Sequence, residues 1–283
     1  MAMSKYVLKT SCPDAKGIIA AVTSMMAKND ANVLDLIQHT ASDIGIFMLK
    51  TLFETPNPFD RESFEKAFRI TADRFKMSWE LHDTNRNERV AILVSKTNHC
   101  LWELLLKHQD GEIDCEIPLV ISNHPHNRGV TEQFKIPFHH IDYKLGKTAA
   151  EERIQQLLID HEINLVTMAR FMQILSPEFT GRWKNKVINI HHGFLPSFTG
   201  AKPYHQAWHK GVKIIGATAH FANELLDLGP IIAQEVIPVS DLSSINHLVQ
   251  IGKDVERRTL VHALKLYLSH SIFVYKNRTF ILR

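Results

Sequence analysis

The chain has 283 residues, of which 45% are hydrophobic and 22% charged, and its formal net charge is +3 at pH 7. This length is comfortable for two domains, and the composition is ordinary for a globular protein. The small, dispersed excess of Lys and Arg argues against nucleic-acid binding, and the lack of an apolar run of roughly 18 residues or of a signal-peptide core argues against a membrane or secreted protein.

The cysteine and histidine patterns indicate a reduced protein without a dedicated metal site. The three cysteines are odd in number and lack CxxC spacing, which predicts free thiols and a cytoplasmic location. The 17 histidines include the adjacent pairs His139-His140 and His191-His192. Neither pair lies in an HExxH motif or has a cysteine at metal-ligand spacing, so we expect no metal ion.

The first 83 residues show the alternating patterns of a small α/β domain. Apolar side chains recur at helical spacing in residues 16–29 and 60–75, which predicts two amphipathic helices. Strands are predicted at residues 6–11, 32–40, 45–54 and 77–82. The order βαββαβ is that of a ferredoxin-like unit. The polar residues 84–88 have no such pattern and are predicted to be a linker.

Residues 89–283 are predicted to form a second α/β domain with a Rossmann-like, mostly parallel sheet. Apolar runs predict strands at residues 89–95, 116–122, 137–141, 164–169, 187–191, 214–221 and 230–239. Helices are predicted at residues 98–108, 129–135, 148–162 and 243–270, and a final hairpin at residues 272–275 and 278–282. We interpret this tail as scaffold and a candidate interface.

The turn after the first strand of this second domain lacks the residues of a typical phosphate site. In nucleotide-binding βα units, glycines at this turn let backbone N–H groups approach a phosphate. Here the turn is Ser95-Lys96-Thr97-Asn98-His99 and contains no glycine. A phosphorylated substrate is therefore disfavoured, although the lysine and the hydroxyl groups leave that alternative open.

Polar side chains interrupt the apolar strands in one region. Asn189 and His191 are two residues apart in a strand and therefore point to the same face. The next predicted strand ends near His220, and the following loop carries Glu224 and Asp227. If these strands are neighbours, the loop returns Asp227 over their ends, beside two imidazoles and an amide. Ligand crevices of open α/β sheets lie outside the carboxyl ends of the strands, where these residues are expected.

Each of these residues also has a purely structural interpretation. Asp227 precedes Leu-Gly-Pro and suits a turn, and Asn189 can satisfy backbone groups of the following loop. An amide, two imidazoles and a carboxylate in this order and spacing nevertheless favour a common site over separate structural roles.

Longer motifs in the same region resemble a known family. The formyl-transfer core of glycinamide ribonucleotide and methionyl-tRNA formyltransferases is similar to Asn189-Ile190-His191, Leu195-Pro196, Thr218-Ala219-His220-Phe221 and Asp227-Leu228-Gly229-Pro230. The most extensive resemblance is to the formyltetrahydrofolate deformylases, because it continues through His192 and residues 201–207 and 211–218. It also includes the N-terminal segment and so covers nearly the whole chain.

The N-terminal segment resembles an ACT domain. Residues 10–19, Thr-Ser-Cys-Pro-Asp-Ala-Lys-Gly-Ile-Ile, are similar to the opening of such a domain. The resemblance implies that ACT sheets pair in a homo-oligomer and that an amino-acid effector binds near this first loop, with Asp14, Gly17 and Asn32 as candidate residues. Gly17 also suits a closely packed helix start, so a purely oligomerising role stays open.

The resemblance implies roles for individual residues. Transfer of a formyl group needs an activated nucleophile, a stabilised tetrahedral oxyanion and a proton for the leaving nitrogen. Asp227 is expected to act as general base and to position water, His191 as oxyanion donor and proton carrier, and Asn189 as polariser. The expected substrate-binding residues are Met172, Gln173, Ile174, Leu175, His192, His220 and Glu224.

Three positions bear on how the family pattern applies. Gln173 stands where arginine is common, but backbone groups of residues 172–175 are implied in binding the folate pterin ring, with an ordinary buried loop as the alternative. Gly193 stands where a small hydroxyl residue is usual. His192 stands where the transferases have proline, which favours water as acceptor, with a loop-capping role as the alternative.

Three functions follow for comparison. The first is hydrolysis of 10-formyltetrahydrofolate to tetrahydrofolate and formate, which supplies formate and balances one-carbon folate pools, as in purine biosynthesis. This reaction is expected to need no cofactor beyond the folate substrate. The second is formyl transfer to an amine acceptor such as glycinamide ribonucleotide, and the third is a folate- or amino-acid-binding regulator without catalysis. The resemblance implies the first, and the glycine-free turn at residues 95–99 favours it over the second.

Overall fold

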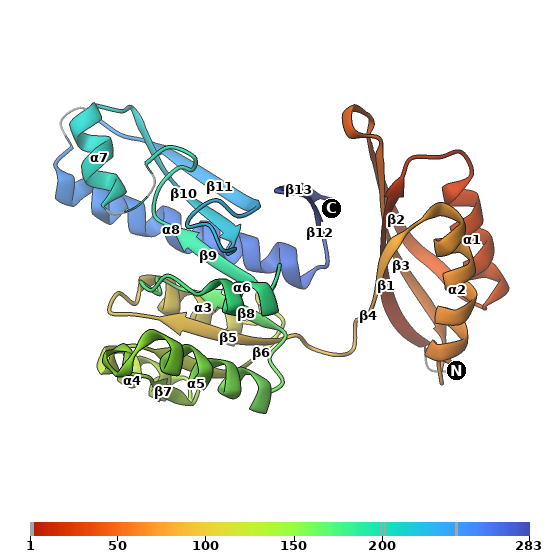
Figure 1. Cartoon of the computed structure of the whole chain (residues 1–283), viewed down its shortest axis with the longest axis horizontal. Helices are drawn as coiled ribbons and strands as arrows, with labels where there is room; N and C mark the ends of the chain where they lie inside the picture. Colours follow the sequence, from red (N-terminus) through yellow and green to blue (C-terminus); the bar gives the residue numbers. More distant parts are fainter. Residues whose placement is uncertain (1–2, 199, 201, 241–242) are drawn as a thin grey trace. The chain divides into compact units, whose positions relative to one another are not determined.

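The computed structural model describes residues 3–198, 200, 202–240 and 243–283 (Figure 1). The chain divides into two compact units. Unit 1 comprises Met1–Asn87, His270–Phe273 and Phe280–Arg283, and unit 2 comprises Glu88–Ser269 and Val274–Thr279. Within the described ranges, none of the helices is both long and apolar enough to cross a membrane.

Unit 1 is built around a four-stranded antiparallel sheet. Its strands are β1 (Met3–Pro13), β2 (Asn32–Ala41), β3 (Ile46–Pro56) and β4 (Ser78–Asp83), in the order β2-β3-β1-β4. Helices α1 (Ile18–Lys28) and α2 (Arg61–Phe75) cover one face of the sheet (Figure 1). The element order confirms the predicted ferredoxin-like unit.

Burial and capping explain these elements of unit 1. Alternate side chains of β1, among them Tyr6 and Leu8, are buried in the core shared with the helices. α1 begins after Gly17, whose φ of 88° is a conformation that glycine adopts readily. α2 begins after Asp60, whose carboxylate accepts the Ser63 N–H at 3.0 Å. The helix starts are therefore specified locally.

The end of the chain covers part of the other face of this sheet. Lys50 donates to Ser271 Oγ at 2.9 Å, and the Lys9 ammonium lies 5.1 Å from the centre of the Phe273 ring. The hairpin of β12 (Ile272–Tyr275) and β13 (Arg278–Ile281) is consequently divided between the two units. The sequence analysis had assigned the whole tail to the second domain.

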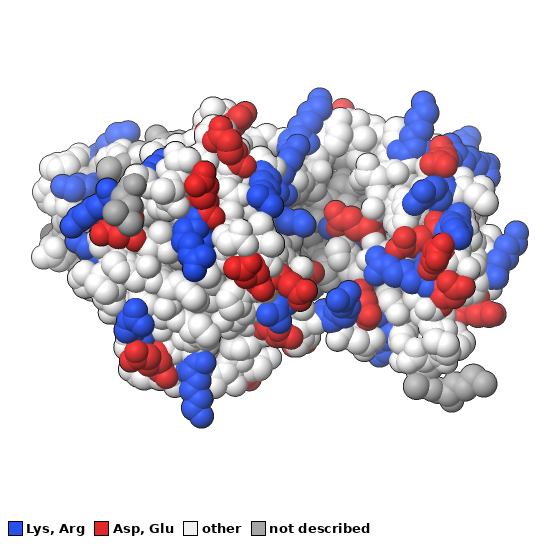
Figure 2. Space-filling view, turned by 60° about the horizontal axis from the view of Figure 1, so that its bottom comes forward, with Lys and Arg blue, Asp and Glu red and all other residues white. Residues whose placement is uncertain are grey.

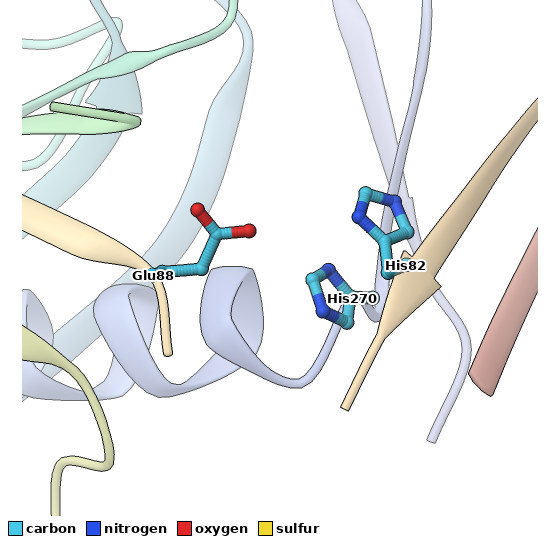
Figure 3. Close-up of side chains that lie close together, drawn as sticks. All are labelled: His82, Glu88 and His270. Atoms are coloured by element: carbon cyan, nitrogen blue, oxygen red, sulfur yellow. The ribbon is translucent and has the colours of Figure 1, made fainter. Parts of the chain in front are cut away.

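Two histidine rings join this terminal segment to unit 1. His82 of β4 and His270 stack with their ring centroids 3.8 Å apart and an interplanar angle of 15° (Figure 3). Burial, with the nearby charges of His82 and Lys9 adding, lowers the pKa of His270 to about 3. The His270 ring is therefore neutral at pH 7, which permits the close stacking.

Unit 2 contains a seven-stranded, mostly parallel sheet in the order β11-β10-β9-β8-β5-β6-β7. The strands are β5 (Arg89–Val94), β6 (Glu116–Ser122), β7 (Phe138–His140), β8 (Leu165–Met168), β9 (Val187–His191), β10 (Ile214–Phe221) and β11 (Ile231–Pro238). The strands from β7 to β9 run parallel, whereas β10 runs antiparallel to both of its neighbours. The predicted Rossmann-like architecture is confirmed.

Helices pack on this sheet and connect its strands. They are α3 (His99–Gln109), α4 (Arg128–Gln133), α5 (Lys147–Asp160), α6 (Pro177–Arg182), α7 (Pro203–Lys210) and α8 (Ile245–Leu268). α8 packs along β9, β10 and β11 and against α3. α6 and α7 were not predicted, because each is short and begins at a proline, a residue that marks a loop as readily as a first helical turn.

The surface charge is dispersed. Figure 2 shows Lys and Arg side chains interspersed with Asp and Glu over the visible face. This distribution agrees with the expectation drawn from the net charge of +3.

Candidate active site

Pairing of β9 with β10 assembles the polar side chains of the site. The register places Asn189 opposite His220 and His191 opposite Thr218. Because side chains of directly opposed residues share a face, all four project to one side of the sheet. Asn189 pairs with Met168, the last residue of β8, and His191 is the last residue of β9, so the site lies at the carboxyl ends of these two parallel strands, as the sequence analysis expected.

The Asp227 carboxylate lies over this face. Its Oδ2 is 3.2 Å from His191 Nδ1, and its Oδ1 is 3.8 Å from His220 Nε2. The residue has a φ of 57°, a left-handed conformation that Asp tolerates better than most residues. Burial acts to raise the pKa of Asp227, but the hydrogen bond and charge of His191 outweigh it, and the pKa is lowered. The carboxylate is therefore ionised at neutral pH.

Both ring nitrogens of His191 face oxygen acceptors. Nδ1 faces Asp227, and Nε2 lies 3.1 Å from the carbonyl oxygen of Phe198. A neutral imidazole has one N–H, so only the doubly protonated ring donates to both oxygens. Gly193 leaves room for this ring, since a Cβ at that position would lie 3.0 Å from His191 Nε2. The ring therefore has an oxygen acceptor within hydrogen-bond distance of each nitrogen, and the acceptor at Nδ1 is a carboxylate.

His220 is held in the neutral form and orients Asn189. Burial lowers the pKa of His220, with the nearby His191 adding to the shift, and the residue is 2% exposed. Its Nδ1 lies 2.9 Å from the Phe221 carbonyl oxygen, an acceptor, and therefore carries the proton. Nε2 then accepts from Asn189 Nδ2 at 3.1 Å. This contact fixes the amide plane, and Nδ2 retains a second N–H for a ligand.

Thr218 anchors the loop that follows β9. Its hydroxyl donates to the Gly193 carbonyl oxygen at 2.9 Å and accepts the Leu195 N–H at 3.0 Å. Gln234 of β11 donates to the Leu195 carbonyl oxygen at 2.8 Å. The loop that carries His192 is consequently held by β10, which pairs with β9, and by β11, which pairs with β10.

A pocket of about 270 Å³ opens beside these groups. One wall is polar and carries the catalytic candidates, and the rest comes largely from residues 168–175 and 222–226. Four large apolar side chains of this wall expose 53–57% of their surface: Met172, Ile174, Leu225 and Leu226. Apolar walls around a few convergent polar groups suit a small ligand with a flat apolar part.

The loop from β8 to α6 is fixed at both ends and open in the middle. Ser95 Oγ accepts the Met172 N–H at 2.9 Å, and the Glu151 carboxylate accepts the Ser176 N–H at 3.0 Å. Between these anchors, the backbone N–H and C=O groups of residues 173–174 make no hydrogen bond to any residue that the structure describes. These backbone groups are available to a ligand.

The structure brings together most of the predicted site residues. His192 and all four residues of 172–175 line the same pocket as Asn189, His191, His220 and Asp227. Glu224 does not belong to this group, because it is exposed and only its neighbours in the loop line the pocket.

The candidate effector residues of unit 1 do not meet within one chain. Asn32 donates to Glu54 Oε1 at 3.1 Å near the end of β3. The Asp14 N–H donates to the Gly45 carbonyl oxygen at 2.9 Å, just before the start of β3. Because β3 has 11 residues, these two places are about 30 Å apart along an extended strand. Asp14 and Gly17 therefore lie far from Asn32.

Sequence reasoning missed Arg170 and the leucines of the 222–226 loop, all of which line the pocket. Arg170 lies two residues beyond the carboxyl end of β8, and that position is the signal that could have identified it. Leu225 and Leu226 carry no comparable signal, because an apolar loop residue is most simply interpreted as core.

A second buried carboxylate lies next to the pocket. Glu256 of α8 is 1% exposed, and its Oε2 is 2.8 Å from His99 Nε2 and 3.4 Å from Arg170 Nε. Its Oε1 accepts the Tyr204 hydroxyl at 2.8 Å. Burial acts to raise the pKa of Glu256, but the hydrogen bond from His99 and the charge of Arg170 lower it. The carboxylate is therefore ionised and paired with the guanidinium.

This second cluster does not fit a metal ion. His99, Cys100 and Glu256 have ligand atoms within 4.8 Å of one another. Arg170 already balances the carboxylate charge, however, and burial, with Glu256 adding, raises the pKa of the Cys100 thiol well above its ordinary value. A protonated thiol beside a guanidinium is a poor cation site.

Comparisons with protein families and curated proteins cover both units. The formyl transferase family model matches residues 88–264, and the ACT domain model matches residues 6–71. The chain is 42% identical over 274 residues to a formyltetrahydrofolate deformylase of Synechocystis sp., an alignment that covers 96% of each protein. It is 39% identical over 281 residues to a formyltetrahydrofolate deformylase of Escherichia coli strain K12, which covers 99% of each.

Solved structures give the same picture. The chain matches a crystal structure of a formyltetrahydrofolate deformylase from Pseudomonas syringae with a TM-score of 0.95 and 38% identity, covering 100% of this chain and 96% of that one. It matches glycinamide ribonucleotide transformylase 1 from Symbiobacterium toebii with a TM-score of 0.68 and 25% identity, covering 72% of this chain and 98% of that one.

Proposed function

The chain belongs to the formyltetrahydrofolate deformylase family, and we propose that its pocket hydrolyses 10-formyltetrahydrofolate to tetrahydrofolate and formate. The observation that carries this proposal is the convergence of three polar groups from distant parts of the chain. Asp227 and His191 pair at 3.2 Å on the sheet face that also carries Asn189, and all three border a pocket whose other wall is largely apolar.

Asp227 activates the water in this proposal. Its lowered pKa keeps it ionised at neutral pH, and its carboxylate borders the pocket. The water oxygen attacks the formyl carbon while one of its protons passes to Asp227. General-base catalysis of this kind contributes about 10²–10⁴-fold to the rate.

His191 and Asn189 stabilise the tetrahedral oxyanion. In the structure, His191 Nε2 lies 3.1 Å from the Phe198 carbonyl oxygen. When the substrate binds, the formyl oxygen replaces that carbonyl oxygen as the acceptor at Nε2, and Asn189 supplies the second donor. As the C–N10 bond breaks, His191 gives a proton to N10. After the products leave, Asp227 releases the proton from water to solvent, and His191 Nε2 takes up a proton from solvent. The formic acid released ionises to formate, so the reaction balances without a further cofactor.

The folate is held by the loop from β8 to α6 and by the exposed apolar side chains of the pocket wall. The free backbone groups of Gln173 and Ile174 suit the donor and acceptor edge of the pterin ring, while Met172 and Leu225 suit its faces. The recognition rests on backbone groups, so it does not require an arginine at position 173.

Transfer to a phosphorylated amine is supported less well. The turn at residues 95–99 contains no glycine. Its first N–H, on Ser95, donates to the Arg170 carbonyl oxygen at 3.3 Å, and the Ser95 hydroxyl holds Met172. These groups support the folate loop and are not free to bind a phosphate.

We extend the proposal to a cytoplasmic homo-oligomer formed through unit 1. β2 is an edge strand of the described sheet, with Leu34 41% exposed, and an exposed edge strand is a template for pairing. All three cysteines are buried free thiols, which suits a reducing compartment. An amino-acid effector that uses both Asp14 and Asn32 would need contributions from two chains. The formate would supply one-carbon metabolism such as purine biosynthesis.

Incubation of the pure protein with 10-formyltetrahydrofolate and no acceptor tests the hydrolytic function. Formate and tetrahydrofolate are expected in equal amounts, and added glycinamide ribonucleotide should not raise the rate. Turnover that requires the amine would assign a transferase instead. Folate binding without turnover under either condition would leave a regulator.

A further inference from the structure

Two hollows of unit 2 are separated by a row of buried polar side chains. The first hollow is the folate pocket, which Arg170 and His192 line on this side. The second, of about 390 Å³, lies between the start of α3 and α8 and is lined by His99. Tyr204 and Glu256 stand between the two hollows and line neither of them.

Contacts run along the whole row. The His192 ring lies 5.9 Å from the Tyr204 ring, measured between centroids. The Tyr204 hydroxyl donates to Glu256 Oε1 at 2.8 Å, and Glu256 Oε2 lies 2.8 Å from His99 Nε2. Tyr204 is 5% exposed and His99 is 7% exposed. The row therefore leaves little free space for a molecule to pass between the hollows.

α8 is shaped to receive the Tyr204 ring. A Cβ at Gly252 would lie 2.1 Å from Tyr204 Cζ and 2.3 Å from its Oη, so the ring occupies space that only glycine leaves free. Glu256 lies four residues further along the same helix face and accepts the hydroxyl. The ring is thus fixed by shape and by a hydrogen bond.

The charged groups of this row, Glu256 and Arg170, take no part in the catalytic steps described above. A buried ion pair such as Glu256 with Arg170 is often no more stable than apolar side chains of the same shape, so its presence calls for another explanation. Burial, with the charge of Arg170 adding, lowers the pKa of His192 to about 3, so this ring is neutral at pH 7. The pocket wall at His192 is therefore uncharged, and the Tyr204 ring packs behind it.

We propose that His192, Tyr204, Glu256 and His99, with Arg170, form an acceptor partition that lets water but no amine reach the formyl carbon. The inference rests on the proposed hydrolysis and identifies the residues that select the nucleophile. With water, a C–O bond forms, the C–N10 bond breaks and N10 gains a proton. With a primary amine, a C–N bond would form instead, giving an N-formyl amine and tetrahydrofolate. Asp227 would take the proton that the amine loses, and His191 would give a proton to N10.

Tyr204→Ala opens the acceptor partition at its centre. The vacated space borders the Glu256 carboxylate, which in turn contacts His99, and a polar cavity of that size admits water and small polar molecules. With glycinamide as the added amine, the ratio of N-formylglycinamide to formate is expected to rise at least about tenfold over the wild type. Both products are measured in the same reaction by mass spectrometry.

Tyr204→Phe is the matched control. It keeps the ring in the space at Gly252 and removes only the hydroxyl, so the product ratio should stay at the wild-type value. Partial unfolding lowers both products together and leaves their ratio unchanged. His192→Ala, which opens the partition from the folate side, gives a second test if Tyr204→Ala does not fold, and the ratio should rise in the same direction.

The outcomes distinguish this inference from the proposed function. An unchanged ratio in Tyr204→Ala and His192→Ala, with formate still released, would overturn the acceptor partition and leave hydrolysis standing. An equal rise in Tyr204→Phe would overturn the steric assignment, because the ring would still be present. A wild-type protein that releases no formate would overturn the proposed function itself.

Discussion

Asp227 and Glu256 each place an ionised carboxylate against an imidazole inside unit 2, at 3.2 Å and 2.8 Å respectively. Asp227 sits in a loop with a left-handed φ and borders the folate pocket. Glu256 sits on the long helix α8, and a guanidinium and a phenol occupy its remaining surroundings. A carboxylate with one open side can exchange protons with a substrate, whereas a fully engaged carboxylate can only hold its neighbours in place.

Asp227→Asn is expected to give the largest effect and to fall on the chemistry alone. The amide keeps the shape and an acceptor for His191 but is not a base, so kcat for formate release should fall about 10²–10⁴-fold. Folate affinity and thermal stability should stay near the wild-type values. Steady-state rates, fluorescence titration of folate and thermal unfolding measure the three quantities. A near-normal rate would assign the base elsewhere.

Glu256→Gln should give the opposite pattern. It leaves the Arg170 guanidinium buried without its counter-charge, which costs about 3–5 kcal/mol of unfolding free energy. Urea denaturation followed by circular dichroism measures this loss. The folded fraction keeps Asp227 and its partners, so kcat per folded molecule should fall far less than in Asp227→Asn. A stable variant with a large loss of kcat would contradict the distinction between the two carboxylates.

Asn189→Ala tests whether the amide beside Asp227 acts on the transition state. Loss of one oxyanion donor lowers kcat by about 10²–10³-fold, or roughly 2.7–4 kcal/mol. KM for the folate should change little, because this donor is needed most when the oxygen becomes negative. A loss expressed only in KM would assign Asn189 to substrate binding.

The smallest expected effect is the pH dependence of stability that His192 of the acceptor partition contributes. The pKa of His192 is lowered from 6.5 to about 3, so below pH 6.5 the unfolded chain binds a proton that the folded chain does not. Its contribution to stability is therefore present above pH 6.5 and lost as the pH falls, by up to about 2 kcal/mol between pH 7 and pH 5.

The check is the unfolding free energy of the wild type and of His192→Asn at both pH values. The difference between the two proteins should shrink on acidification. His270 of unit 1, whose pKa is also about 3, adds a similar pH dependence to both proteins and cancels in the comparison. A difference that does not change with pH would show that folding leaves the pKa of His192 unshifted.

The parts of the site that the sequence predicts are those set by local geometry. Asn189 and His191 share a face because they are two residues apart in a strand. The convergence of these residues with His220 and Asp227 was expected if the strands are neighbours. The antiparallel direction of β10 and its register with β9 depend on how the chain crosses between distant segments, so neither was predicted. The exposure of Glu224 is likewise a property of the folded loop.

The acceptor partition could not be predicted from the sequence, because its residues come from distant segments of the chain. The helical pattern of residues 243–270 predicts a buried face, but a glutamate on that face has meaning only with its partners. His99, which contacts Glu256, is 157 residues away in sequence. Gly252 also has no evident role until the Tyr204 ring is seen against it.

The division of the C-terminal hairpin between the units has a consequence for biogenesis. Residues 270–273 and 280–283 belong to unit 1, yet the ribosome makes them after every strand of the seven-stranded sheet of unit 2. The first sheet therefore emerges with the surface around Lys9 and Lys50 bare, and it acquires its cover only after the intervening polypeptide has been translated. Unit 1 can therefore complete its folding only after the end of the chain has been synthesised.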